Sequence, residues 1–371
     1  MPTVMIEPLD TLFFRDGRPF NMGDETWAEG MFPPNPSVIY GALRSAYFSL
    51  YPDEFQYAGT ENDPSNNIAI TDIYFCELSD KNEKYFYYLT PADILKPKNK
   101  KSGNYDYQLI SSKNTSLENK IKNIPLYNIS ENLIRLENTF ITRRTFLKYI
   151  QASNKEKVET ESINSFISNE PKIGIGRERT KHAAKDGMLY RTNMIRTANK
   201  SKSDRKLHFV ITYNFEGDKE FIIPDTTLLK LGGEGKVINI NSINPQSDIL
   251  LSENFSSKYI KFYLKTPLIT NDLIPKKIYE YINEYLKVEV ENITPITYKP
   301  IYIGGFDLKN KKPKTMYKAY PSGSIFIVET KEKVTYTNKI FKECINHSLS
   351  EKREKEGYGL FQLAKFGENN E

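Results

Sequence analysis

The residues best suited to chemistry gather in one basic stretch, residues 171–206. Eleven lysines and arginines fall within it, against three acidic residues, Glu178, Asp186 and Asp204. The whole chain carries a formal net charge of +5, so the remainder of the chain is slightly negative. A clustered positive field attracts phosphate backbones. Composition alone leaves two interpretations open: a solvated basic loop, or a surface that binds nucleic acid.

Within this stretch, glycines and cations alternate. Gly174 and Gly176 permit a bulge or let the backbone approach a ligand closely. Arg177 and Arg179 then stand on the same side of an extended segment, where two guanidinium groups suit successive phosphates of single-stranded RNA. A hairpin with exposed arginines is the competing interpretation. The candidate contacts in the stretch are Lys172, Gly174, Gly176, Arg177, Arg179, Lys181, His182 and Arg191.

Histidine chemistry is confined to His182. The chain has three histidines, and none of them has another ligand at a metal-like spacing. An imidazole among cations is able to act as acid or base in RNA cleavage through the 2′-hydroxyl, or simply to contact a base or phosphate. We expect no metal and no cofactor, because the glycines match neither a dinucleotide loop nor a P-loop.

The elements that must position these residues begin with an N-terminal strand and the turn that holds Arg15 and Arg18. A proline loop at 33–37 then predicts a helix over 38–48, with Ser37 as its cap and Arg44 on its surface. Strands are predicted at 68–78, 84–89 and 207–215, and one or two helical turns at 224–231. Gly232 and Gly233 end those turns. The lysine-, asparagine- and serine-rich segments 96–123 and 151–160 are expected to be surface insertions.

A second unit repeats this pattern. Alternation predicts strands at 259–264, 297–306 and 324–329, helices at 278–286 and 337–348, and a last strand after Gly357-Tyr358-Gly359. Two β-α-β-β-α-β units indicate an α+β protein with two ferredoxin-like (RRM-like) domains, antiparallel sheets and long inserted loops. We divide it into residues 1–235 and 236–371, with the boundary between about 220 and 255.

Composition excludes other classes of protein. No run of about 18 apolar residues is present, so a membrane span is not expected. The N-terminus lacks a basic leader followed by an apolar run, and the two cysteines are far apart in sequence. We therefore expect a cytoplasmic protein without a disulfide framework.

Several blocks, in order, resemble the third subunit of the Cmr effector complex of type III-B CRISPR systems. They cover nearly the whole chain: residues 9–20, 32–37, 41–44, 171–179 with 187–190, 231–234, 321–326 and 357–360. The resemblance implies a protein of the RAMP superfamily that is not catalytic and holds the 5′ repeat-derived tag of the CRISPR RNA. It also implies docking to the large polymerase-like subunit and to the backbone subunit, with target RNA as a further candidate partner.

With the resemblance, the candidate RNA contacts extend beyond the basic stretch to Arg15, Arg18, Arg44, Gly232 and Gly233. The alternative function is a metal-independent RAMP endoribonuclease that processes CRISPR transcripts with His182 as acid or base. A tag-binding subunit of a type III-A complex is a third interpretation.

Overall fold

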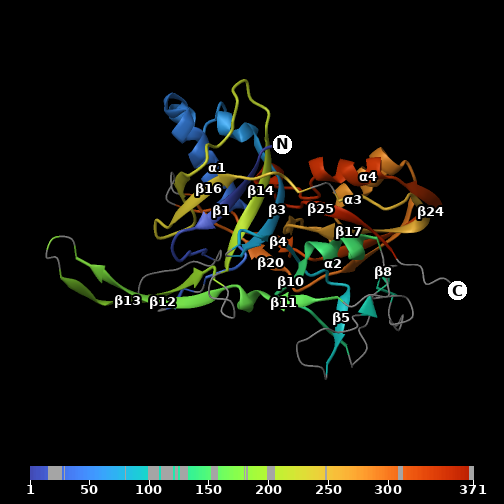
Figure 1. Ribbon diagram of the computed structural model, residues 1–371, viewed down its shortest axis with the longest axis horizontal. Helices are drawn as coiled ribbons and strands as arrows, with labels where there is room; N and C mark the ends of the chain where they lie inside the picture. Colours follow the sequence, from blue (N-terminus) through green and yellow to red (C-terminus); the bar gives the residue numbers. More distant parts are fainter. Residues whose placement is uncertain are drawn as a thin grey trace.

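The computed structural model describes residues 1–15, 27–28, 30–79, 81–98, 108–109, 120–121, 124–125, 133–151, 158–178, 180, 183–198, 205–246, 249–307 and 312–366. Arg18, Arg179, Lys181 and His182 lie outside these ranges, as do large parts of the expected insertions at 96–123 and 151–160. The described residues form an α+β protein with antiparallel sheets (Figure 1), as the sequence predicts.

An eight-stranded antiparallel sheet, the N-terminal sheet, holds most of the first unit. Its strands in spatial order are β11 (Thr160–Ser162), β10 (Thr139–Thr142), β4 (Lys84–Leu89), β3 (Ile68–Leu78), β14 (Lys206–Phe215), β1 (Thr3–Pro8), β16 (Val237–Ser242) and β15 (Thr227–Lys230). The helix α1 (Pro36–Leu50) packs on one face, where Leu43 and Tyr47 are buried with Val4 and Ile6 of β1. This face is therefore closed by the helix.

The start of α1 differs from the prediction in its cap. Pro36 is the first helical residue, where its missing N–H has no partner to lose, and Asn35 precedes it as N-cap. Ser37 lies inside the helix, and its Oγ is 2.8 Å from the hydroxyl of buried Tyr358. The hydroxyl expected to cap the helix instead ties the helix to the C-terminal part of the chain.

The centre of the N-terminal sheet is β14, and the expected third strand β4 lies further out, beyond β3. In the order β16-β1-β14-β3, the strands are fourth, first, third and second along the chain, with α1 between the first two. β14 takes the central place because it is apolar on both faces: Phe209 and Ile211 lie in the core under α1, and Val210 lies in the opposite core. The sheet continues past residue 235, because β16 pairs with β1.

Residues 227–230 form the strand β15, so the helical turns expected at 224–231 are wrong. Leu229 and Leu231 are buried, whereas Leu228 before them is 62% exposed and Lys230 between them is exposed. This alternation has a period of two, which is that of a strand on a sheet edge.

The second unit has a four-stranded antiparallel sheet, the C-terminal sheet. Its spatial order is β19 (Val290–Ile296), β24 (Ile325–Tyr336), β17 (Phe255–Leu264) and β25 (Phe361–Lys365). The helix α3 (Lys276–Tyr281) continues into the π-turn η5 (Ile282–Leu286) between β17 and β19, and α4 (Asn338–Glu343) lies between β24 and β25. The β-α-β-β-α-β sequence of elements is present, but the second strand is β19 rather than the predicted 297–306.

Shorter elements complete the fold. The small sheet of β18 (Leu268–Ile269), β23 (Tyr317–Tyr320) and β20 (Ile301–Ile303) adjoins the hairpin of β21 (Phe306–Asp307) and β22 (Lys312–Pro313). Further short strands are β5 (Ile94–Pro97), β6 (Gln108–Leu109), β7 (Lys120–Ile121), β8 (Ile124–Pro125) and β9 (Leu133–Arg135). The single-turn helices are η1 (Pro52–Tyr57), η2 (Pro64–Asn67), η4 (Ile163–Ser165), η6 (Cys344–Asn346) and η7 (Glu354–Glu356).

The two sheets share one hydrophobic core. Val210 of the N-terminal sheet and Tyr263 of the C-terminal sheet belong to the same buried cluster. The helix α2 (Arg143–Ile150) contributes Phe146, whose ring lies 4.3 Å from that of Tyr88 and 5.0 Å from that of Tyr263. Figure 1 shows α2 beside β10 and β17. The inner faces of both sheets are therefore covered by protein.

A buried ion pair lies in this shared core. Lys261 Nζ of β17 is 2.7 Å from Asp93 Oδ2, and the two side chains are 1% and 0% exposed. The hydroxyl of Tyr149 in α2 donates to both oxygens of Asp93, at 2.9 and 3.1 Å. Lys265 forms a second link, at 2.8 Å to Asp72 of β3. These polar contacts fix how the two sheets face each other, because an unpaired charge is costly in such a site.

Candidate nucleic-acid interface

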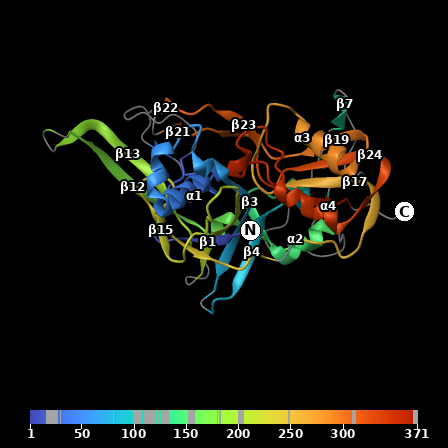
Figure 2. The ribbon, with the colours of Figure 1, turned by 90° about the horizontal axis from the view of Figure 1, so that it is seen from above.

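A long hairpin extends away from the two sheets. It is formed by β12 (Ser168–Arg177) and β13 (Ala184–Arg196), and both views show it reaching outward from the body (Figures 1 and 2). The ladder is regular from Ser168 opposite Arg196 to Ile175 opposite Leu189, and its register shifts between Ile175 and Arg177. The short strand β2 (Trp27–Ala28) pairs with β13 in parallel near the base. The basic stretch predicted to bind RNA thus supplies most of a projecting arm.

The predicted contacts divide between the two strands of this arm. Lys172, Gly174, Gly176 and Arg177 lie on β12, and Arg191 lies on β13. Lys172 pairs with Thr192 and Arg191 with Ile173, so Lys172 and Arg191 point to opposite faces of the hairpin. Both cations are exposed.

Gly174 has a packing role. It lies opposite Tyr190 in the ladder, and a Cβ atom at Gly174 would lie only 2.1 Å from Cζ of the Tyr190 ring. The sequence predicts that a ligand approaches the backbone closely at Gly174. In the structure the ring of Tyr190 occupies that space.

The base of the arm carries a compact charge cluster. Lys236 Nζ, which follows the 231–234 block, lies 2.6 Å from Asp10 Oδ2, and Arg196 forms an ion pair with Glu170. The hydrogen bond from Lys236 is the main reason why the pKa of Asp10 falls to about 2. Lys236 also hydrogen-bonds Lys172 and thereby lowers the pKa of that ammonium. The cluster holds three cations and two carboxylates, and a bound phosphate would relieve the repulsion between the lysines.

Gly232 and Gly233, which follow β15, pack against Phe13 in the segment after β1. A Cβ atom at Gly232, whose φ is +75°, would lie 2.5 Å from the carbonyl oxygen of Phe13. The N–H of Gly233 donates to that same oxygen at 2.9 Å. Two resembling blocks, 9–20 and 231–234, therefore meet at the base of the arm, close to the charge cluster.

The remaining arginines have different environments. Arg15 is exposed and forms an isolated β-bridge with Gly30. Arg44 on α1 is held by Asp63 at 2.5 Å and by Ser65 Oγ at 2.7 Å, which favours a structural ion pair over a free RNA contact.

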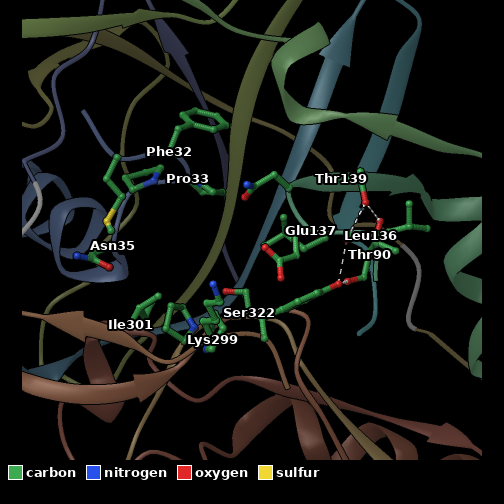
Figure 3. Close-up of a pocket in the computed structure, with 17 residues that line it drawn as sticks. Phe32, Pro33, Asn35, Thr90, Leu136, Glu137, Thr139, Lys299, Ile301 and Ser322 are labelled. Atoms are coloured by element: carbon green, nitrogen blue, oxygen red, sulfur yellow. Dashed lines mark hydrogen bonds between the residues drawn. The ribbon is translucent and has the colours of Figure 1, made fainter. Parts of the chain in front are cut away.

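A pocket of about 270 Å³ opens between the two units (Figure 3). Its walls combine apolar groups, such as Phe32, Pro33 and Ile301, with polar groups that include Lys299 and Ser322. Such a mixture is typical of sites for small ligands or bases. The hydroxyl of Tyr298 donates to the backbone oxygens of Thr90 (3.1 Å) and Leu136 (3.0 Å) and fixes one wall. Residues 32–37 and 321–326, two further segments that resemble the Cmr subunit, both contribute to the lining of this pocket.

The two described histidines lie in structural surroundings. His208 is 2% exposed in β14, and burial lowers the pKa of its imidazole. His347 contacts the rings of Tyr281 and Tyr285. No group of three or more His, Cys, Asp or Glu side chains within the described ranges is placed to hold a metal ion. No described helix has the length and apolar character needed to span a membrane.

Sequence reasoning missed Asp10, Lys236 and the pocket. Asp10 is an isolated acid, and Lys236 lies 64 positions beyond Lys172 in the sequence, so only the fold brings these charges together. A second run of lysines, between residues 299 and 318, was visible by counting charges and was also not singled out.

The chain is similar to subunits of known CRISPR effector complexes. No curated protein matches the chain significantly. Among solved structures, the chain is 19% identical to a chain of a type III-B Cmr-beta complex bound to cognate target RNA, over 96% of this chain and 95% of that one, with a TM-score of 0.49. A second such complex, bound to target RNA and AMPPnP, gives 19% identity over 93% and 89%, with a TM-score of 0.46. A Csm3-Csm4 subcomplex of a type III-A system gives 19% over 91% and 97%, with a TM-score of 0.37.

The family assignment rests on sequence. The model of the family described as CRISPR-associated protein (Cas_Cmr3) matches residues 4–365, which is nearly the whole chain. The chain therefore belongs to the Cas_Cmr3 family, and its resemblance to the third subunit of the type III-B Cmr complex is confirmed.

Proposed function

We propose that this chain is a non-catalytic RNA-binding subunit of a type III-B Cmr complex and holds the 5′ repeat-derived tag of the CRISPR RNA. The observation that carries the proposal is the projecting β12–β13 arm, with exposed Lys172 and Arg191 on its two faces and the Lys172–Lys236–Arg196 cluster at its base. Cations on a projecting ribbon can follow a phosphate backbone on both sides.

The sheets themselves support this choice of surface. We infer that each is the core of a ferredoxin-like unit, because β16-β1-β14-β3 and β25-β17-β24-β19 both follow the order fourth, first, third, second. An RRM-type unit binds RNA by stacking bases on its open sheet face. Here Val210 and Tyr263 bury those faces against each other. RNA is therefore left with surfaces outside the two large sheets, such as the arm and the pocket.

The partners follow from the family. We propose that the chain docks the large polymerase-like subunit and the backbone subunit in the cytoplasm, with target RNA as a further contact. The pocket beside Lys299 and Asn35 is the site that we propose for a base at one end of the tag, since it joins apolar walls to a few polar groups.

Charge reversal on the arm tests the proposal. In the reconstituted complex, Lys172→Glu/Arg191→Glu is expected to weaken binding of tagged guide RNA about tenfold or more, and to lower the slope of log K against log salt by about 1.4, or about 0.7 for each phosphate contact. The matched control is Lys276→Glu/Lys331→Glu, which reverses two exposed lysines elsewhere. Arg177→Glu/Arg179→Glu extends the test to two further arginines of the basic stretch.

Equal binding by the arm variants and the control would refute the assignment of the arm. The non-catalytic role is tested separately, by incubating the purified chain with repeat RNA in the presence of a chelator. Cleavage that disappears in His182→Ala would replace the proposal by the endoribonuclease alternative.

A further inference from the structure

A second basic surface lies on the segment that forms β20 to β23, which starts beside the pocket residue Lys299. Between residues 299 and 318 the sequence has six lysines and a single acid, Asp307. Four of these lysines, Lys299, Lys312, Lys314 and Lys318, lie in the described ranges, and all four are exposed. Within the part of the chain that the structure describes, none of the four forms an ion pair with a carboxylate. Their charge is therefore available to a ligand.

An aromatic ring accompanies this charge. In the β20–β23 ladder, Tyr302 lies directly opposite Lys318, so the ring and the ammonium project from the same face. Tyr302 is 63% exposed. The neighbours Ile303 and Ala319 point the other way, into a small buried cluster. The ladder thus has one face that serves the core and one face with an unburied tyrosine beside a lysine.

Backbone hydrogen bonds connect the base of the arm to one wall of the pocket. At the base of the arm, Ile195 of β13 exchanges backbone hydrogen bonds with Leu12, at 2.7 and 2.8 Å. Farther along the same segment, Phe14 accepts a hydrogen bond from the N–H of Met31 at 2.8 Å. Met31 lines the pocket, and Lys299 and Ile301 line its other side (Figure 3). Figure 2 shows β21 to β23 along the same side of the molecule as α1.

We propose that Tyr302 and Lys318 form a second contact for single-stranded RNA, in which the tyrosine ring stacks on a base and the lysines around it bind phosphates. Stacking on an aromatic platform combined with backbone charge is the usual way in which proteins hold single strands without reading their sequence. The inference rests on the proposed function in taking RNA as the ligand, but it uses none of the residues of the arm.

The test measures binding of the purified full chain to a fluorescent oligouridylate of about 12 nucleotides, which lacks the tag sequence. Tyr302→Ala/Lys318→Ala is expected to bind about tenfold more weakly and to lose about 0.7 of the salt slope. The control is Tyr279→Ala/Lys276→Ala, which removes an exposed tyrosine and an exposed lysine from α3. Thermal unfolding of both variants checks that the fold is kept, since neither substitution removes buried side chains.

Three results would overturn the inference: oligouridylate binding by Tyr302→Ala/Lys318→Ala that equals the control, no measurable binding by the unaltered chain at low salt, or normal RNA binding with failed incorporation into the Cmr complex. The last result would make the surface a protein-docking site. Failure of the proposed function is distinguishable, because it would appear as normal tag binding by Lys172→Glu/Arg191→Glu whatever the Tyr302 variant does.

Discussion

Lys261 and Asp93 are paired in the core between the two sheets, and their burial sets the effect expected from losing the pair. Replacing Lys261 by Met keeps the unbranched chain of the lysine and removes its ammonium. Asp93 is 0% exposed, and among the described residues its side chain keeps the hydrogen bonds from Tyr149 alone. Removing one partner of such a pair leaves an uncompensated buried charge, so we expect Lys261→Met to lower the free energy of unfolding by about 3–5 kcal/mol.

A second substitution separates charge from packing. Adding Asp93→Asn removes the orphaned charge while retaining an oxygen that accepts from Tyr149. The double variant is therefore expected to recover at least about 2 kcal/mol relative to Lys261→Met alone. The control is Lys331→Met, which breaks a pair with Glu289 in which the side chains are 60% and 75% exposed. Because solvent screens exposed pairs, this variant should unfold at nearly the same urea concentration as the unaltered chain.

The assay is equilibrium unfolding in urea followed by circular dichroism, with all four proteins compared at the same salt concentration. Because the two sheets share one core, we expect a single transition that moves as a whole. The reasoning is refuted if Lys261→Met and Lys331→Met unfold at the same urea concentration, or if the double variant is no more stable than Lys261→Met.

The remaining predictions concern charge and titration. Asp10→Asn removes a carboxylate from the lysine cluster and should strengthen RNA binding roughly two- to fivefold in filter binding, whereas unchanged affinity would place phosphates elsewhere. Burial lowers the pKa of His208, so the unfolded chain takes up a proton at a higher pH than the folded one; stability should fall as the pH drops from 7 to 5, and His208→Gln should flatten this dependence of the melting temperature. Burial raises the pKa of Cys76 to about 12 and that of Cys344 to about 11, so neither thiol should react with iodoacetamide at pH 8 until urea unfolds the chain; rapid labelling of the folded protein would contradict this.

Local patterns predicted most elements but not their partners. The strands at 68–78, 84–89 and 207–215 are present, as is the helix after the proline loop. The place of β4 and β14 in the sheet was wrong, because alternation within a strand does not encode which neighbour it pairs with. Only the apolar character of β14 on both faces pointed to a central position. At 224–231, the short run of leucines was read as helical turns, although buried and exposed residues alternate there as in a strand.

The site shows the same division between local and long-range information. The basic stretch 171–206 was visible in the sequence, and it forms most of the arm. The charged partners at the base of the arm were not visible, because Lys236 and Asp10 lie in segments that are distant in sequence. Arg44 was predicted to contact RNA, but its guanidinium binds Asp63 and Ser65 instead. These partners lie 19 and 21 positions along the sequence, and the sequence pattern does not show that the chain brings them back to Arg44.

The burial of both sheet faces determines where the RNA binding that we propose can take place. An aromatic residue on β17 such as Tyr263 occupies the kind of strand position from which an RRM stacks bases, yet its hydroxyl donates to the backbone of Leu89 and its ring packs on Phe146. The sheets therefore serve as a rigid body, closed by the Lys261–Asp93 pair. The RNA contacts that we propose lie on additions to that body, where exposed cations remain: the β12–β13 arm, and the β20–β23 ladder with Tyr302 and Lys318. Because these surfaces lie outside the core, their side chains can be replaced without loss of stability, and binding and folding can be measured independently.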